Sequence, residues 1–176
     1  MASCESLKHI IFEGEVKTLR YACFQNNESL EELTIPSGVT ELPDGLCTHC
    51  NNLKTVKIPN TVTQINRSFW DCPKLERVKL PSSLTHIAMA AFTNDASLKE
   101  IVIPENVSCI EDFGVSPEID RKITILCRNM PNISCNFRIY DEEPMFDIYV
   151  SSHLLSKYRE MEGLQKVSSR IHSVDN

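Results

Sequence analysis

The chain has 176 residues, of which 41% are hydrophobic and 24% charged, a composition ordinary for one soluble domain with a substantial core. Its formal net charge of −6 gives no bulk attraction for polyanions, so nucleic acid is disfavoured as a partner. No apolar run approaches the roughly 20 residues of a membrane helix, and no basic segment followed by an apolar one opens the chain. Neither membrane insertion nor a visible export signal is predicted.

Leucine recurs over the first part of the chain at intervals of 23, 23, 22 and 23 residues, at Leu7, Leu30, Leu53, Leu75 and Leu98. A period in the twenties indicates a repeat array whose single units are too small to bury their own apolar faces. Stability then comes from stacking neighbouring units into one continuous core. We divide the chain into five repeats over residues 1–112 and an irregular last turn with a cap over 113–176, within one domain.

Each repeat is predicted to open with a short strand, because apolar and polar residues alternate after the leucine. Proline follows this strand in four of the five units and ends it, since proline lacks the amide donor of a continued ladder. The inward-facing pairs are Ile10 and Phe12, Leu33 and Ile35, Val56 and Ile58, Val78 and Leu80, and Ile101 and Ile103.

A second apolar pair follows each strand at a fixed offset, and it turns the chain and refills the core. Six residues before the next leucine stands a residue predicted to fill the opposite wall, namely Phe24, Cys47, Phe69 and Phe92 in turn. The filler is small at Cys47, so we expect Leu46 or its neighbours to lean inward there. On that basis the substitution Cys47→Phe should be tolerated or mildly stabilising.

Eight cysteines in a chain of this size favour free thiols over the disulfide framework of a small secreted domain. Three residues before the repeat leucines stand Cys4, Asn27, Cys50, Cys72 and Asp95. Such a column predicts a small side chain that bonds to backbone at a turn.

The run Cys47-Thr48-His49-Cys50 has zinc-ligand residue types, but a second CxxC is missing and the repeat itself explains the spacing of Cys50 and Cys72. No metal site is therefore predicted. The sequence also lacks G-x-S-x-G, a phosphate-binding glycine loop and H-E-x-x-H, so no catalytic residue and no cofactor is predicted either.

The combined pattern L-x-x-I-x-I-P-x-x-V-x-x-I-x-x-x-A-F-x-x-C resembles the BspA-type leucine-rich repeat, and its clearest copies run from Leu53 to Cys72 and from Leu75 to Phe92. The first unit departs from it with Glu13 in place of proline. The resemblance implies a right-handed α/β-type solenoid with a parallel sheet. It also implies a role in adhesion or protein binding at cell surfaces, although a fold carries function poorly.

The end of the chain resembles the cap that closes such solenoids. The run Asp147 to Val150 is predicted as a last strand, and Ser151 or Ser152 as the cap of a helix of about ten residues that ends before Gly163. An amphipathic lid of this kind covers the apolar surface and strand edge of a last repeat. No matching lid is visible before Ile10 and Phe12, which we therefore predict as an open edge that another chain can occupy.

Two loops interrupt the repeat before the cap, at 112–121 and 135–144. Loops on a rigid scaffold often carry recognition. We instead favour a packing role for their aromatic residues, which would join the solenoid to the cap; these are Phe113, Phe137, Tyr140 and, just beyond the second loop, Phe146. For the single tryptophan, Trp70, packing against Asp71 to Pro73 is preferred over exposure as a partner anchor.

Residues that face away from the core on neighbouring strands stack about 4.8 Å apart and form columns in space. One column is His9, Glu32, Thr55, Arg77 and Glu100, and a second is Ile11, Thr34, Lys57, Lys79 and Val102. A third, Lys8, Glu31, Lys54, Glu76 and Lys99, alternates in sign and predicts weak ion pairs between units.

These fifteen positions carry a net charge of +2, against −6 for the whole chain. Lys57, Arg77 and Lys79 make the most concentrated positive region, which suits an acidic protein loop or an anionic glycan. The predicted partner-binding residues are His9, Glu32, Lys57, Arg77, Lys79 and Glu100. A solvated sheet face without a ligand is the alternative.

The prediction is therefore a non-catalytic module that binds a macromolecule, most of all a protein, through the strand face and loops. The alternative is an assembly subunit that forms homo-oligomers through Ile10 and Phe12. The compartment stays open, because the resemblance points to the cell surface or secretion whereas the missing signal and the thiols point to the cytoplasm.

Overall fold

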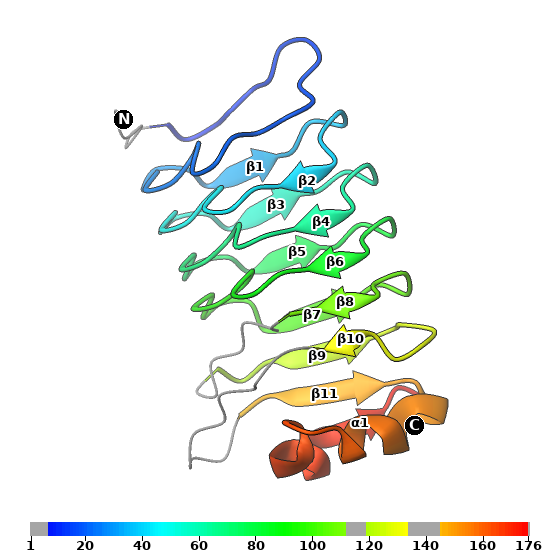
Figure 1. Ribbon diagram of the computed structural model, residues 1–176. Coiled ribbons are helices and arrows are strands. Elements are labelled where there is room, and N and C mark those ends of the chain that lie inside the picture. The colour runs from blue at the N-terminus through cyan, green and yellow to red at the C-terminus, as the bar shows by residue number, and fades with distance from the viewer. Residues whose placement is uncertain (1–6, 112–118, 134–144, 176) are drawn as a thin grey trace.

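The computed structural model describes residues 7–111, 119–133 and 145–175. The chain winds into a stack of similar turns, and the strands of successive turns lie side by side (Figure 1). The first strands of the turns are β1 (Glu32–Thr34), β3 (Thr55–Lys57), β5 (Arg77–Lys79), β7 (Glu100–Ile103), β9 (Lys122–Ile125) and β11 (Asp147–Val150). The second strands are β2 (Glu41–Leu42), β4 (Gln64–Ile65), β6 (His86–Ile87), β8 (Cys109–Ile110) and β10 (Asn132–Ile133).

All strand pairs are parallel, and each pairs residues one repeat apart. In the first sheet Glu32 pairs with Thr55, and Thr55 pairs with Arg77. Equivalent positions of successive repeats are thus neighbours in space. The predicted repeat solenoid with a parallel sheet is confirmed.

The two sides of the solenoid differ in continuity. The second strands form one unbroken sheet in the order β10-β8-β6-β4-β2. The first strands form two sheets, β1-β3-β5 and β7-β9-β11-β12, where β12 (Ile171–Ser173) belongs to the cap. The ladder of the first strands is therefore interrupted between β5 and β7.

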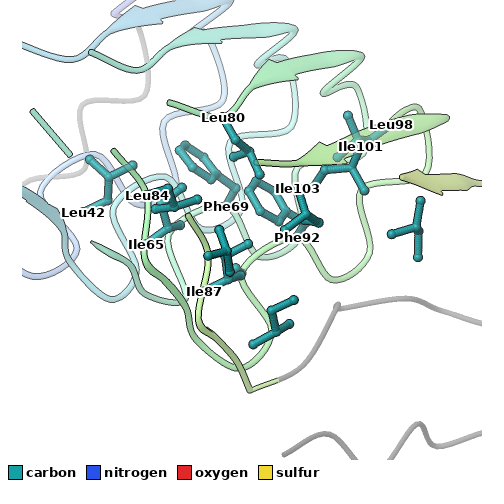
Figure 2. Close-up of a cluster of buried hydrophobic side chains, with 14 of the residues drawn as sticks. Leu42, Ile65, Phe69, Leu80, Leu84, Ile87, Phe92, Leu98, Ile101 and Ile103 are labelled. Atoms are coloured by element: carbon teal, nitrogen blue, oxygen red, sulfur yellow. The ribbon is translucent and has the colours of Figure 1, made fainter. Parts of the chain in front are cut away.

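The core lies between the two sides and is built from the predicted columns. Leu30, Leu53, Leu75 and Leu98 are fully buried. Figure 2 shows how side chains of several turns meet in the interior, with Phe69 and Phe92 next to each other. Their rings stack with centroids 5.7 Å apart. Burial of about 25 cal/mol per Å² of apolar surface makes this continuous column the main source of stability.

In the turn that contains Cys47, a large neighbouring side chain compensates for the small volume of the cysteine. Leu46 and Cys47 are both fully buried, whereas the neighbouring rungs combine Ser68 with Phe69 and Ala91 with Phe92. Leu46 leans into the core, as predicted for this rung. Because it already occupies the space that a phenylalanine at position 47 would need, the expectation that Cys47→Phe is tolerated is replaced by one of overpacking.

The column three residues before each leucine bonds to backbone as predicted. The Cys50 thiol donates a hydrogen bond to the Phe24 carbonyl, and the Cys72 thiol donates to the Cys47 carbonyl, both at 3.1 Å. Asp95 accepts a bond from the Cys72 amide at 2.8 Å. The column thus ties each turn to the one before it. Cys4 lies outside the described residues.

The same turns need left-handed backbone. Four residues before each leucine, φ is positive at Asn26, His49, Asp71 and Asn94. Eight residues before it, φ is positive at Ala22, Gly45 and Ala90. Glycine adopts this conformation without strain, whereas alanine does not.

The first repeat does not form the predicted strand. Residues 7–13 have no strand pairing, and the Lys8 carbonyl accepts a long bond of 3.4 Å from the Glu31 amide. Ile11 is 87% exposed, and Ile10 and Phe12 are half-buried. Among the described residues nothing packs on the outer side of this unit, so a single neighbour is too little to hold it in a ladder.

The cap differs from the predicted ten-residue helix. It contains the 3-10 helix η1 (Ser152–Leu154), the α-helix α1 (Leu155–Glu160) and a second 3-10 helix, η2 (Gln165–Arg170). Ser151 makes no side-chain cap bond; instead the Asp175 carboxylate accepts a bond from the Ser152 amide at 3.2 Å.

The run Asp147 to Val150 is also not the last strand, because β12 pairs with β11 on its outer side. The alternation of β12 is hidden in the sequence, since its second inward residue is a serine, Ser173, which is buried. The packing role expected for Phe146 agrees with its burial, whereas Phe113, Phe137 and Tyr140 lie outside the described residues.

Candidate functional site

The strand face is the outward surface of β1, β3, β5 and β7. In the strand register, Lys57 is the neighbour of Thr34 on one side and of Lys79 on the other. Arg77 is the neighbour of Thr55 in the adjacent column of outward residues. Lys57, Arg77 and Lys79 are all exposed and lie on the adjacent strands β3 and β5. The structure thus brings together the three cations that the sequence singled out.

These three cations have no ion-pair partner among the described residues, whereas three other basic residues of the strand side each have one. Lys54 pairs with Glu31 at 2.8 Å, Lys122 with Glu100 at 3.6 Å and Arg128 with Glu105 at 2.9 Å. The Glu31 carboxylate holds the pKa of Lys54 above its ordinary value. A free cation keeps its charge available for a ligand, whereas a paired one has an acceptor already.

The remaining predicted site residues are more scattered. Glu32 is exposed on β1 in the same sheet as the cations. Glu100 lies on β7, across the interruption of the ladder, and pairs with Lys122. His9 is exposed in the first repeat, which forms no strand. In the charge-alternating column, Lys54 and Glu31 form the one ion pair found in the described part of the chain.

The strand face is hollowed where the ladder is interrupted. A groove of about 450 Å³ lies between β5 and β7, with Val78, Leu80, Val102, Pro104 and Leu126 as its apolar lining and Glu76, Arg77, Lys79 and Glu100 as its charged lining. Grooves that bind ligands commonly have volumes of roughly 300 to 1,000 Å³. Nothing in the sequence indicates this groove, because Val78 and Leu80 follow the same pattern as the inward pairs of other repeats.

The strand face continues onto the cap, which sequence reasoning missed. The Lys122 ammonium lies 4.8 Å from the centre of the Tyr149 ring, and this ring lies 5.1 Å from that of His172. Asp147 accepts a 2.8 Å bond from His172 and pairs with Arg170 at 3.6 Å. Here the polar groups satisfy one another, so this region is a closed network, unlike the cations of β3 and β5.

Trp70 contacts the preceding turn, a contact that the sequence prediction did not name. Its ring lies 5.2 Å from the ring of His49 in the preceding turn, and it is half-buried. His49 in turn bonds to Asp71 at 2.6 Å. The tryptophan therefore braces two turns against each other.

The cysteine side chains of the run Cys47 to Cys50 are buried. Burial raises the pKa of the Cys47 thiol well above its ordinary value, and the Cys50 thiol bonds to a carbonyl. Within residues 7–111, 119–133 and 145–175, no three metal-ligating side chains form a group suited to a metal ion. The described cysteines at 23, 47, 50, 72, 109 and 127 are free thiols.

No helix in the described part of the chain is long and apolar enough to cross a bilayer.

Comparison with known proteins supports the repeat assignment. The family model of BspA type leucine-rich repeat regions matches residues 1–114 in six copies. A comparison with curated proteins finds no significant match.

Two solved structures show the same architecture. The pneumococcal vaccine antigen PcpA aligns with a TM-score of 0.74 at 19% identity, over 96% of this chain and 40% of PcpA. A leucine-rich repeat protein from Bacteroides ovatus aligns with a TM-score of 0.52 at 23% identity, over 78% of this chain and 43% of the other. This chain thus spans less than half the length of either protein, and the likeness concerns the fold alone.

Proposed function

Because the chain belongs to the BspA-type leucine-rich-repeat family, whose modules generally bind proteins and are non-catalytic, we propose that it is a protein-binding module of adhesion type. The strand face is the binding surface in this proposal. The observation that carries it is the group Lys57, Arg77 and Lys79, exposed on adjacent strands without ion-pair partners in the described part of the chain. Cations arranged in this way favour an acidic surface of a partner protein.

A capture experiment with charge-reversed protein tests the proposal. The double variant Lys57→Glu/Lys79→Glu reverses two exposed charges without touching the core. Lys157→Glu/Lys166→Glu reverses two exposed cap charges and is the matched control. Proteins captured by the parent chain and by the control, but not by the strand-face variant, would support the site. Identical capture by all three chains would remove the strand face from consideration, and retention on a glycan array alone would favour the anionic glycan instead.

The alternative role, an assembly subunit, is favoured by one observation. The first repeat exposes Ile11 to 87% and leaves Ile10 and Phe12 half-buried. Charges at Ile10 or Phe12 could unfold the first repeat, so Ile11→Lys is the cleaner variant. A specific oligomer of the parent chain in light scattering that dissociates in this variant would support assembly, and a monodisperse parent monomer would argue for the binding module alone.

A further inference from the structure

The groove at β5 and β7 opens on the outward surface that carries the cations of β3 and β5. Val102 of β7 has the place in its repeat that Lys79 has in the repeat before, so both side chains face outward. Leu126 follows β9, and its amide donates to the Ile103 carbonyl at 2.9 Å. This bond places Leu126 next to Pro104, which also lines the groove. The apolar wall of the groove therefore lies on the same face as the cations.

The apolar side chains of this wall are exposed. Val102 and Leu126 are 40% and 43% exposed. In the place of Val102, the turns of β1, β3 and β5 have polar residues, namely Thr34, Lys57 and Lys79. Adjoining apolar side chains that are exposed and bordered by polar ones are typical of a site that a partner covers, because their burial is favourable. The wall thus favours an apolar group as the occupant of the groove.

The groove reaches below the outward side chains. Its volume is about 450 Å³, and its lining includes Val78 and Leu80, which form the inward pair of β5. Val78 is half-buried, while its counterparts Val56 and Ile101 are 4% and 3% exposed. A side chain that enters the groove from outside therefore contacts apolar groups below it as well as beside it.

The charges around the groove are asymmetric. Arg77 and Lys79 on the β5 side have no ion-pair partner among the described residues. On the β7 side, Glu100 is paired with Lys122 at 3.6 Å. Glu76 is the remaining acidic group of the lining. The β5 side is therefore positive and favours carboxylates beside the apolar occupant.

The presence of an unpaired arginine at the groove favours an aromatic occupant over an aliphatic one. A guanidinium group stacks on the face of an aromatic ring and also binds carboxylates in a bidentate manner, and Arg77 is available for either contact. Aromatic side chains are also the most common anchors of protein interfaces, because they bury a large area at the cost of few rotatable bonds. An aliphatic side chain would fill the groove without using the guanidinium.

We propose that the groove between β5 and β7 receives one aromatic side chain from an exposed loop of a partner protein, and that acidic residues next to it in that loop bind Arg77 and Lys79. The ring packs on Val102 and Leu126. Lys57 on β3 extends the positive surface for a further carboxylate. This inference rests on the proposed protein-binding function and adds the kind of segment that is recognised.

A displayed library of disulfide-closed random loops of about eight residues tests the inference on the full chain. Enriched loops are expected to carry Trp, Tyr or Phe next to Asp or Glu. Selection on Val102→Thr/Leu126→Ala, which strips the apolar wall, and on Lys79→Glu should reduce this enrichment about tenfold. Met89→Ala and Lys166→Glu are the matched apolar and charged controls at exposed positions and should keep it. Enrichment of Leu or Ile in place of the aromatic residue would overturn the inference.

A synthetic disulfide-closed peptide with tryptophan between two glutamates provides a second readout by NMR. We expect it to cause saturable shifts of the Val78, Val102 and Leu126 amides. Its counterparts with alanine in place of the tryptophan, or with lysines in place of the glutamates, should bind about tenfold more weakly. Absence of shifts at these amides with the tryptophan peptide, or equal binding of either counterpart, would contradict the proposed recognition.

The two proposals fail in different ways. If captured proteins depend on Lys57 and Lys79 while neither the library nor the tryptophan peptide binds the groove, the strand face remains the binding surface and the inference of an aromatic anchor is wrong. If acidic aromatic loops bind the groove but proteins are captured independently of Lys57 and Lys79, the groove is a loop-binding site and the proposed function of the wider face fails.

Discussion

The turn before each repeat leucine depends on one small side chain that both accepts and donates a hydrogen bond. The Cys72 sulfur accepts from the Cys50 amide, and its thiol donates to the Cys47 carbonyl. Asp95 stands one repeat later, where its Oδ1 accepts from the Cys72 amide. Its Oδ2 is buried without a partner among the described residues. A protonated carboxyl therefore fits this turn better than a carboxylate.

The buried arginine beside Asp95 does not change this conclusion. The Arg121 guanidinium donates to the Asp95 backbone carbonyl at 2.8 Å and to the Leu98 carbonyl at 2.7 Å. Its bonds thus go to backbone rather than to the carboxyl group. Burial raises the pKa of Asp95 to about 8, although the Cys72 amide and the Arg121 charge lower it.

The pH dependence of stability tests the protonation of Asp95. The unfolded chain has the ordinary pKa of 3.8 at this residue, so between about pH 4 and 8 it binds fewer protons than the folded chain. The free energy of unfolding then falls as pH rises through this range, by at most about 1.4 kcal/mol per unit, and levels off above it. Asp95→Asn keeps one acceptor and one donor but cannot titrate, so urea unfolding of this variant should lack the slope.

Asp120→Asn is the matched control, because Asp120 is exposed. It should keep the slope of the parent chain. Equal slopes for the parent and Asp95→Asn would show that Asp95 is ionised in the folded protein.

The left-handed alanines offer a gain in stability. Ala90 has a φ of 57°, and Gly45 occupies the equivalent position with a φ of 69°. Since an L-residue pays roughly 1 to 2 kcal/mol in this conformation and glycine pays part of that in entropy, Ala90→Gly should raise the free energy of unfolding by up to about 1 kcal/mol. Urea unfolding measures it. Ala96→Gly, at an exposed position without positive φ, should instead be neutral or destabilising.

At the scale of the structural elements, the buried residues opposite the strands fill a similar total volume in each repeat, although the residue types differ. Cys47→Phe alone should lower the free energy of unfolding by roughly 1 to 3 kcal/mol, because Leu46 already fills that rung. The double variant Leu46→Ala/Cys47→Phe copies the arrangement of Ala91 and Phe92 and should recover most of the loss. Thermal melts compare the three chains, and a single variant that melts at or above the parent would show unfilled space beside Cys47.

Much of the solenoid could be predicted because the leucine period fixes which residues are neighbours. It placed Lys57 beside Lys79 and Cys50 beneath Cys72. Where the period ends, prediction failed: Asp120 takes the place of the leucine in the rung of β9, and β12 ends in a buried serine. The interruption between β5 and β7 depends on backbone geometry, which Val78 and Leu80 do not reveal by residue type.

The candidate site was predictable to the same extent. Its cations lie on regular repeats, so their adjacency followed from alignment. The network of Lys122, Tyr149 and His172 did not, because two of its members belong to strands β11 and β12 beyond the repeats. Whether two charged side chains form an ion pair also depends on how far each one reaches. Only the structure therefore shows that Lys57 and Lys79 have no ion-pair partner among the described residues.

For the whole molecule, stability is approximately a sum over neighbouring turns, and the cap protects the last one. Tyr158 of α1 is fully buried. Tyr158→Ala should lower the local opening free energy of β11 and β12 by about 3 to 5 kcal/mol, while β3 keeps its protection in hydrogen exchange. Tyr158→Phe removes only a buried hydroxyl without a partner in the described part of the chain and should be neutral or stabilising. Equal loss of protection at β3 and β11 would show one cooperative unit.

The two sides of the solenoid respond unequally to bending. The sheet from β2 to β10 runs without interruption past the point where the strand side divides. Bending the array at that point breaks no ladder bond on the strand side, while the opposite sheet and the stacked Phe69 and Phe92 rings keep the two segments joined. We therefore expect a change in the curvature of the array to alter the width of the strand face at this place before any other part of the first-strand ladder.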